Sequence, residues 1–266
     1  YTSYIKYESN VQLALLEYKE RKIESAKKYL NTIIESDCKS THKASAAIER
    51  AKIEFNQKNY EDAINSCKLA KSIDNSINTK FRCGMIEYHI ANTKNDFDLS
   101  ISILDSLKSM NPNLEMQTEI ALKESELYAE KNIYSKSSEI LKKHLDAPLN
   151  DFDKSAVWYE LGKIEKELGS LDEALIAFQK SGLLPNKNES HKNQVAIQQG
   201  ICFYKMKKFV DSFNLLLNAV LIDEDSKDTC IIFIFLNMIK TYGKTEFSQI
   251  DEKISQFEEH EDNYIK

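Results

Sequence analysis

The chain has few helix-breaking residues and no long apolar stretch. Its 266 residues include 6 glycines and 3 prolines, too few for the many turns that a β-rich fold requires. A transmembrane helix needs an apolar run of roughly 18 residues or more, and the run at residues 230–236 is much shorter. These absences predict an all-α protein that is not inserted in a membrane.

Basic residues are also in short supply. The chain has 36 Lys and Arg against 42 Asp and Glu, a net charge of −6. Binding to phosphates needs clustered Lys and Arg, so we predict neither a nucleic-acid partner nor an anionic membrane partner. The five cysteines are odd in number and scattered, without a Cys-x-x-Cys pair. Free cysteine behaves as a small hydrophobic residue, so we expect a reducing compartment, cytoplasmic or nuclear.

What the sequence does contain is a helical hairpin, clearest around Trp158. Trp158 and Leu161 lie three positions apart on one face of a first helix, and Gly162 allows a second helix to approach closely. Ala174 is the small residue where the two helices cross, and Phe178, one turn later, fills the space beside it. If the Trp158 ring is buried, its replacement by Ala should cost about 3–5 kcal/mol.

The same pattern recurs at nearly constant spacing. Successive crossing residues are separated by 37, 37, 37, 37 and 38 positions. These crossing residues are Ala26, Ala63, Ser100, Ser137, Ala174 and Ser212. Three positions earlier, an apolar residue opens each second helix: Ile23, Tyr60, Phe97, Tyr134, Leu171 and Phe209. Twelve positions earlier lies the close-approach residue: Ala14, Ala51, Tyr88, Ser125, Gly162 and Gly200, of which only Tyr88 is large.

The spacing Trp-x-x-Leu-Gly, then Ala-x-x-x-Phe, then Pro185 resembles one tetratricopeptide (TPR) unit, a helix–turn–helix of roughly 34 residues. Glu165 departs from the family pattern, which usually has Tyr there. The resemblance implies an all-α, right-handed superhelical solenoid of about six repeats over residues 1–225. The repeats start near residues 7, 44, 81, 118, 155 and 193. Residues 226–266 are expected to form an atypical terminal pair of helices or cap, over 230–242 and 247–260.

In this family the first helices line a concave groove that binds a partner helix or an extended peptide. The resemblance implies that the second, fifth, ninth and twelfth residues of each repeat line it. The residues that we predict to contact a protein partner are Tyr18, Lys52, Phe55, Arg82, Met85, His89, Leu122, Glu126, Tyr159, Lys163, Ile197 and Tyr204. The alternative is that several of these side chains pack against the neighbouring repeat instead.

The sequence contains no catalytic constellation. Gly162, Gly169 and Gly182 fall on hairpin positions and do not form a phosphate-binding loop after a strand. Cys38 and His42 have the i, i+4 spacing of two metal ligands, but a structural zinc needs four. We therefore predict no enzyme activity, no cofactor and no metal.

These observations predict a protein–protein interaction scaffold or adaptor. The chain begins at Tyr1 without Met, and we interpret it as a fragment or part of a larger complex or chain. A second resemblance, of residues 137–145 and 51–57 to the FAT-type helical repeats of phosphatidylinositol-3-kinase-related kinases, implies a non-catalytic region of a large regulatory protein. A bacterial envelope TPR module is a third alternative, and the unpaired cysteines disfavour it.

Overall fold

The computed structural model describes residues 2–186 and 190–220, and six further residues between 231 and 240. Those six are Ile231, Phe233, Ile234, Leu236, Asn237 and Lys240. Side chains are described from residue 7 onward, except at residues 8 and 220. Within these ranges every regular element is an α-helix, as the sequence predicts. The helix predicted over 247–260, and much of that predicted over 230–242, lie outside the described residues.

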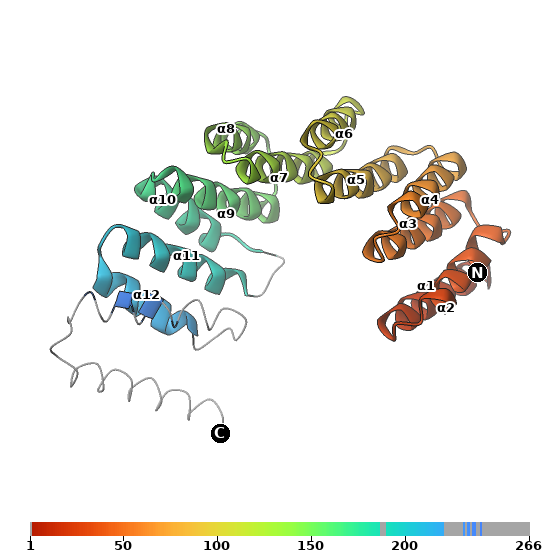
Figure 1. The fold of residues 1–266 in the computed structure, drawn as a ribbon, viewed down its shortest axis with the longest axis horizontal. Helices are drawn as coiled ribbons and strands as arrows, with labels where there is room; N and C mark the ends of the chain where they lie inside the picture. The colour runs from red at the N-terminus through yellow and green to blue at the C-terminus, as the bar shows by residue number, and fades with distance from the viewer. Residues whose placement is uncertain are drawn as a thin grey trace, which may run out of the picture. The chain divides into compact units, whose positions relative to one another are not determined.

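Twelve helices in the described ranges pair into six hairpins (Figure 1). The first helices are α1 (Thr2–Lys19), α3 (Ser40–Asn56), α5 (Ile77–Thr93), α7 (Leu114–Glu130), α9 (Asp151–Leu168) and α11 (His191–Lys205). The second helices are α2 (Ile23–Glu35), α4 (Tyr60–Ile73), α6 (Phe97–Ser109), α8 (Tyr134–Leu145), α10 (Leu171–Leu183) and α12 (Phe209–Val220).

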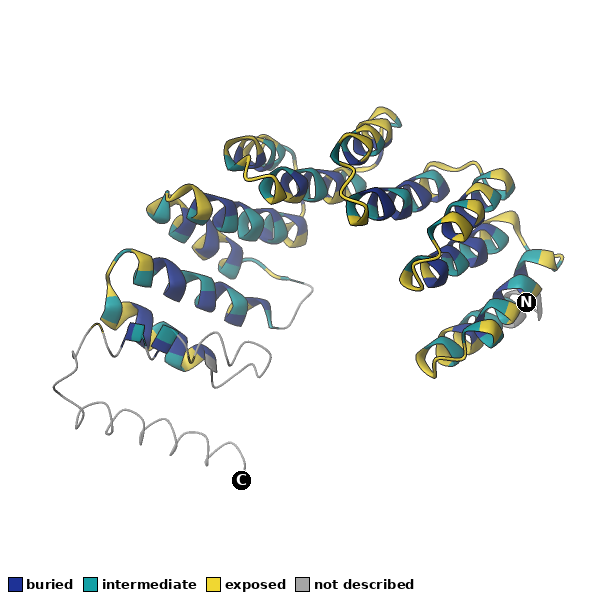
Figure 2. Ribbon diagram, in the orientation of Figure 1, coloured by how far each residue is buried: buried dark blue, intermediate teal, exposed yellow. Residues whose placement is uncertain are grey.

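The chain divides into an N-terminal unit, residues 1–120, and a C-terminal unit, residues 121–266. In both units the second helix of one hairpin packs against the first helix of the next. In the N-terminal unit α2 packs on α3 and α4 on α5; in the C-terminal unit α8 packs on α9 and α10 on α11. The buried residues therefore lie where helices face their neighbours, while the turns are largely exposed (Figure 2).

The hairpin register predicted from the sequence is confirmed. All six second helices begin at the predicted opening residue. All six crossing residues have 0% exposure, so each lies against another helix. The apolar residues four positions after them are at most 1% exposed: Leu30, Cys67, Leu104, Leu141, Phe178 and Leu216. A helix that repeats this buried pattern but cannot cover it alone must be stacked on its neighbours.

Small residues bring the two helices of a hairpin close together. A Cβ atom added to Gly162 would lie 2.6 Å from Cε1 of Phe178, so only glycine fits without movement of the ring. At two of the three crossings that carry serine, the hydroxyl ties the two helices. Ser137 Oγ donates to the carbonyl of Ser125 at 2.8 Å, and Ser212 Oγ donates to the carbonyl of Gly200 at 2.7 Å.

In the third hairpin the close-approach position holds the large residue Tyr88. The close contact between the two helices lies at a different residue of α5. Tyr88 is 1% exposed, so the position is buried although it carries a large ring. One turn earlier, a Cβ atom on Gly84 would lie 2.6 Å from Cδ2 of Leu107. The glycine needed at the crossing therefore stands at Gly84 in this repeat, and Ser100 Oγ donates to Asp96 O in its own helix at 2.7 Å.

The turn inside each hairpin has one conformation in all six repeats. The residue two positions before each second helix has a positive φ, between 57° and 82°. These residues are Arg21, Lys58, Asn95, Asn132, Gly169 and Lys207. In the second repeat, Asn59 N donates to Glu54 O at 2.9 Å, the 6→1 bond that ends a helix in a Schellman motif. Only one of the six residues is glycine, which is why the sequence alone does not reveal the motif.

Trp158 is not a core residue. Its side chain is only partly buried, and Lys180 Nζ lies 4.1 Å from the ring centroid in a cation–π contact. A loss of about 3–5 kcal/mol on replacement of Trp158 by Ala is expected only if the ring is buried. The ring is only partly buried, so this loss is not expected. Leu161, three positions later, is 3% exposed and faces the core.

The described residues after α12 extend the same packing. Ile234 belongs to a buried cluster with Phe213 and Leu216 of α12. Asn237 has 0% exposure, and its Nδ2 donates to Ser212 Oγ at 2.9 Å. These residues cover α12 as a first helix covers the preceding second helix elsewhere in the chain.

Candidate protein-binding surfaces

The twelve residues predicted to contact a partner all lie on first helices. In the N-terminal unit they are Tyr18 on α1, Lys52 and Phe55 on α3, and Arg82, Met85 and His89 on α5. In the C-terminal unit they are Leu122 and Glu126 on α7, Tyr159 and Lys163 on α9, and Ile197 and Tyr204 on α11. Ten are at least partly exposed, whereas Met85 and Ile197 are 6% and 5% exposed and belong to the core.

A charged cluster joins α3 and α5 in the N-terminal unit. Arg82 Nη1 donates to Ser45 Oγ at 2.9 Å, and its Nη2 lies 3.0 Å from Glu49 Oε1. Lys52 Nζ lies 2.9 Å from the same Glu49 oxygen. One carboxylate thus faces two cations, which leaves a net positive charge held in a fixed position on a partly exposed face.

Aromatic rings lie close together on α3 and the helices beside it. The Phe55 ring centroid lies 6.3 Å from that of His89 and 5.9 Å from that of Tyr60. Tyr18, on α1, accepts a hydrogen bond on its hydroxyl from Asn56 Nδ2 at 2.9 Å. A positively charged group beside half-buried rings provides both apolar anchoring area and orientation for a peptide or helix.

The C-terminal unit repeats this combination on α9. The Tyr159 ring makes edge contacts with Phe178 and His191, at centroid distances of 5.8 and 5.2 Å. Burial raises the pKa of Tyr159 to about 12, so its hydroxyl stays protonated and can donate a hydrogen bond at neutral pH. Lys163 Nζ lies 5.9 Å from the Tyr159 ring centroid and 2.8 Å from Glu160 Oε2.

Further cations lie beside this aromatic pair. Lys166 Nζ donates to Gln198 Oε1 at 2.7 Å, and burial lowers the pKa of Lys166. Lys205 Nζ lies 4.0 Å from Glu167 Oε1. The Tyr204 ring packs against Phe209 and Phe233, with centroids 5.6 and 5.3 Å away.

Two buried carboxylates at one repeat position escaped the sequence analysis. Glu54 is 6% exposed, and Glu165, three repeats later, is 3% exposed. Ser138 Oγ donates to Glu165 Oε1 at 2.6 Å, and Lys142 Nζ lies 2.7 Å from the same oxygen. The residue that departs from the TPR pattern is therefore a polar link between α9 and the preceding hairpin. The recurrence of Glu at a spacing of three repeats was the available signal.

A second buried polar group joins α9, α10 and α11. Ser155 Oγ donates to Ser181 O at 3.2 Å and Ser181 Oγ to Ser155 O at 2.7 Å, so both hydroxyl protons are used. His191 Nε2 lies 2.8 Å from Ser181 Oγ and 3.1 Å from Ser155 Oγ, so one ring nitrogen contacts both hydroxyls. Both serines have 0% exposure and His191 has 5%, so this Ser–His group lies in the packed interior between α9, α10 and α11.

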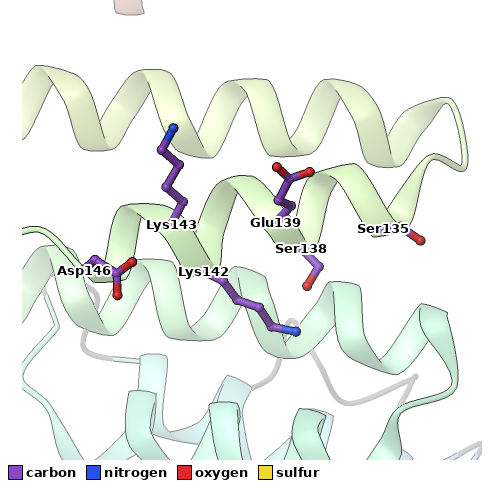
Figure 3. Close-up of a pocket in the computed structure, with 6 residues that line it drawn as sticks. All are labelled: Ser135, Ser138, Glu139, Lys142, Lys143 and Asp146. Atoms are coloured by element: carbon purple, nitrogen blue, oxygen red, sulfur yellow. The ribbon is translucent and has the colours of Figure 1, made fainter.

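An open pocket of about 530 Å³ lies along α8. Its lining residues are Ser135, Ser138, Glu139, Lys142, Lys143 and Asp146 (Figure 3). Lys142 and Ser138 point toward α9, where they hold Glu165. Lys143 and Glu139 point toward the helix on the other side of α8. Ser138 and Lys142 are both engaged by the buried Glu165, so this lining provides a polar surface.

Across the described residues, no group of three or more His, Cys, Asp or Glu side chains is arranged to hold a metal ion. His42 stacks on Tyr7 with ring centroids 4.1 Å apart, and Cys38 Sγ donates to Ile33 O at 3.6 Å. A membrane-spanning candidate, long and apolar enough to cross a bilayer, is also missing from the helices in the described part of the chain.

Residues 155–181, which comprise most of α9 and α10, match the family model of the tetratricopeptide repeat. The other five hairpins share the register of this one. The chain therefore contains a tetratricopeptide-like hairpin at residues 155–181, and its other hairpins have the same fold. No curated protein matches it in sequence.

Solved structures share the fold of this helical array. Yeast Tom70 superposes with a TM-score of 0.70 at 15% identity, over 94% of this chain and 50% of Tom70. The quorum sensor NprR from B. thuringiensis gives a TM-score of 0.63 at 12% identity, over 92% of this chain and 72% of NprR. Cut9, in the APC/C hetero-tetramer Cut9-Hcn1, gives 0.58 at 15% identity, over 87% of this chain and 43% of that chain. At these identities the likeness establishes the fold.

Proposed function

We propose that this TPR array is a protein–protein interaction adaptor without catalytic activity, and that the first helices of each unit bind a partner helix or an extended peptide. The observation that carries the proposal is the recurring pair of a half-buried aromatic ring and a held cation. In the N-terminal unit, Phe55 and Lys52 lie three positions apart on α3, and Lys52 is held by Glu49. In the C-terminal unit, Lys163 lies over the Tyr159 ring.

The chemistry of these surfaces suits protein better than nucleic acid. Each cation is accompanied by a carboxylate: Glu49 faces Arg82 and Lys52, and Glu160 faces Lys163. Phosphate binding would need cations without such partners. A partner segment with apolar anchors and a few acidic residues matches the rings and the remaining positive charge.

The location that we propose is a reducing one, the cytoplasm or the nucleus. Cys67, Cys83 and Cys202 are free and have 0% exposure. Each occupies a core position on its helix, where the thiol packs as a small hydrophobic group.

The partner of the Cut9 chain named above also supports the adaptor role, since that TPR-like chain was solved in a complex with Hcn1.

Photo-crosslinking from defined positions tests the proposal. A photoreactive residue in place of Lys52 or Lys163, whose side chains are 51% and 44% exposed, should give adducts to one partner protein in cells. Lys108 and Lys136 on second helices are matched controls, with side chains 41% and 45% exposed, and should give none. Equal adduct formation from first and second helices would refute the proposed surfaces.

Substitution separates binding from folding. Phe55→Ala and Lys163→Glu should each weaken capture of the crosslinked partner by tenfold or more, with the circular-dichroism spectrum and the melting temperature near those of the wild type. If both variants unfold the protein, these side chains belong to the core and the surface assignment is wrong.

A further inference from the structure

Two cysteines face each other where the second hairpin packs on the third. Cys67 lies on α4 and Cys83 on α5, and both side chains have 0% exposure. Cys83 Sγ donates to the carbonyl oxygen of Cys67 at 3.5 Å, and the two thiols also form a hydrogen bond with each other. Both belong to one buried cluster, which also contains the small residues Ala63 and Ala70. The junction between these hairpins therefore holds two thiols in direct contact.

The same two register positions are apolar at the other junctions between hairpins. One lies four positions after the crossing residue of a second helix, and the other lies 16 or 17 positions later, on the next first helix. The other pairs are 0–4% exposed: Leu30 with Ala46, Leu104 with Ile120, Leu141 with Val157, and Phe178 with Val195. Because such pairs fill the junction without sulfur, packing alone does not require a thiol on both sides.

The two thiols differ in how readily they ionise. The hydrogen bond between them raises the pKa of Cys67, and burial raises it further. The same hydrogen bond lowers the pKa of Cys83; burial and Glu87 oppose this change, and the positive charge of Lys71 assists it. Lys71 and Glu87 each lie one turn after a cysteine, and Lys71 Nζ is 2.7 Å from Glu87 Oε1. Since the thiolate is the nucleophile, Cys83 is the thiol that reacts first.

We propose that Cys67 and Cys83 are a redox-sensitive pair, which closes into a disulfide in the presence of hydrogen peroxide and fastens α4 to α5. The Cys83 thiolate attacks a peroxide oxygen, the O–O bond breaks, and a sulfenic acid and hydroxide form. The Cys67 sulfur then attacks the Cys83 sulfur, the S–O bond breaks, and a second hydroxide leaves. The two thiol protons convert both hydroxides to water, so the thiols lose two electrons and the peroxide gains them.

The disulfide would act on the N-terminal unit. The thiols are buried while the hairpins are packed, so oxidation requires a local separation of α4 from α5. Once formed, the bond constrains the unfolded chain and holds the second and third hairpins together until a dithiol reductant reverses it. In the described part of the C-terminal unit, Cys202 is the single cysteine and provides a matched control. The inference is independent of the proposed function, because it concerns the junction between hairpins.

Peptide mapping of the whole chain tests the pairing. The reduced protein is treated with hydrogen peroxide, its remaining thiols are alkylated, and it is digested with trypsin. Trypsin releases residues 59–68 and 83–94, each with one cysteine, and these peptides should appear joined with the loss of two hydrogen atoms. Treatment continues, with mild warming, until alkylation of a parallel sample shows that both thiols have become accessible. Absence of the joined product at that point, or equal amounts of products joined through Cys38, would overturn the proposal.

Thermal melting of matched variants tests the fastening. Peroxide should raise the melting temperature of the wild type and of Cys202→Ala by about 5 °C or more, and a dithiol reductant should reverse the rise. Cys83→Ala also removes one fully buried thiol and should show no rise, and Cys67→Ala repeats the test from the other side. A rise of the same size in either of these two variants would overturn the proposal. So would joined peptides in a protein whose melting temperature is unchanged.

A sulfenic-acid trap, such as dimedone, tests the order of the two steps. In Cys67→Ala the sulfenic acid on Cys83 has no thiol to consume it, so peroxide should yield a trapped adduct on Cys83. Cys83→Ala should yield severalfold less adduct on Cys67, because the thiol of Cys67 ionises less readily. Equal or reversed yields would overturn the assignment of Cys83 as the attacking thiol.

Discussion

The two units place a buried glutamate at the same repeat position but satisfy it differently. In the N-terminal unit, Glu54 accepts a hydrogen bond from Ser66 at 2.5 Å and faces Lys27 and Arg50 at 3.9 and 3.7 Å. Both cations are themselves largely buried, with side chains 18% and 21% exposed. In the C-terminal unit, the Glu165 carboxylate faces Lys142, whose side chain is 57% exposed.

The comparison shows that one repeat position can carry two kinds of interface. The Glu54 network extends over three helices, since Arg50 of α3 also donates to Asn31 of α2 at 2.6 Å and to Ser66 of α4 at 3.0 Å. The Glu165 link joins only α9 and α8. A buried cation left without its carboxylate is costly, whereas an exposed lysine released into water is not.

The largest expected effect follows from that difference. Glu54→Ala should destabilise the chain by about 3–5 kcal/mol, because Arg50 and Lys27 lose their counter-charge in a buried site. Glu165→Ala should cost about 1–3 kcal/mol, since Lys142 becomes solvated and only Ser138 loses a buried partner. Urea unfolding of both variants gives the two values. Equal losses would show that the exposure of the cation does not set the cost.

Glycine replacement compares the helix crossings of the two units. Gly162→Ala should cost about 1–3 kcal/mol, because three atoms of the rigid Phe178 ring lie 2.6 to 2.9 Å from the added Cβ. Gly84→Ala should cost less, because the nearest atom is Cδ2 of Leu107, the end of a side chain that can change rotamer. Thermal melts of the two variants test this order. A larger loss for Gly84→Ala would contradict it.

The shared turn should give a smaller effect of opposite sign. Lys58 has a φ of 63°, and glycine adopts that conformation without a Cβ clash. Lys58→Gly should stabilise the chain by about 1 kcal/mol, and more at high salt, where the favourable lysine–helix dipole interaction is screened. Gly169→Ala in the C-terminal unit, at φ 82°, should destabilise it. Chemical denaturation at two salt concentrations provides the measurement.

The smallest effect at neutral pH concerns histidines of the C-terminal unit. Burial lowers the pKa of both His144 and His191 in the folded chain. The unfolded chain, with a histidine pKa of about 6.5, therefore binds more protons as the pH falls. The stability contributed by these residues is complete above about pH 6.5 and is lost on acidification toward the lowered pKa. His191→Asn should flatten the fall in melting temperature between pH 7 and 5.5. An unchanged slope would contradict this role.

The repeat register was readable from the sequence because packing imposes it. Only a small residue fits at a helix crossing, so the spacing of Ala26 and Ala63 fixed the hairpins and the first residue of every second helix. The polar links were not readable in the same way. A Glu at position 54 or 165 looks like a surface residue until the cations of neighbouring helices are placed beside it.

The candidate site was only partly predictable for a related reason. Repeat position identifies the first-helix face, and Lys52, Phe55 and Tyr159 on that face are at least partly exposed. It does not say how far the next hairpin covers that face. Met85 and Ile197 are therefore core residues, although their positions in the repeat match those of exposed ones. Contact of any of these residues with a partner stays a prediction.

The buried thiols give the molecule built-in reporters of local opening. Cys67 and Cys83 mark the N-terminal unit and Cys202 the C-terminal unit; Cys83 Sγ donates to Cys67 O at 3.5 Å, and burial raises the pKa of Cys202 to about 11. Alkylation requires an accessible thiolate, so each thiol reacts only when its surroundings separate. Mass spectrometry of the labelled peptides would then time the opening of either unit in the unaltered sequence.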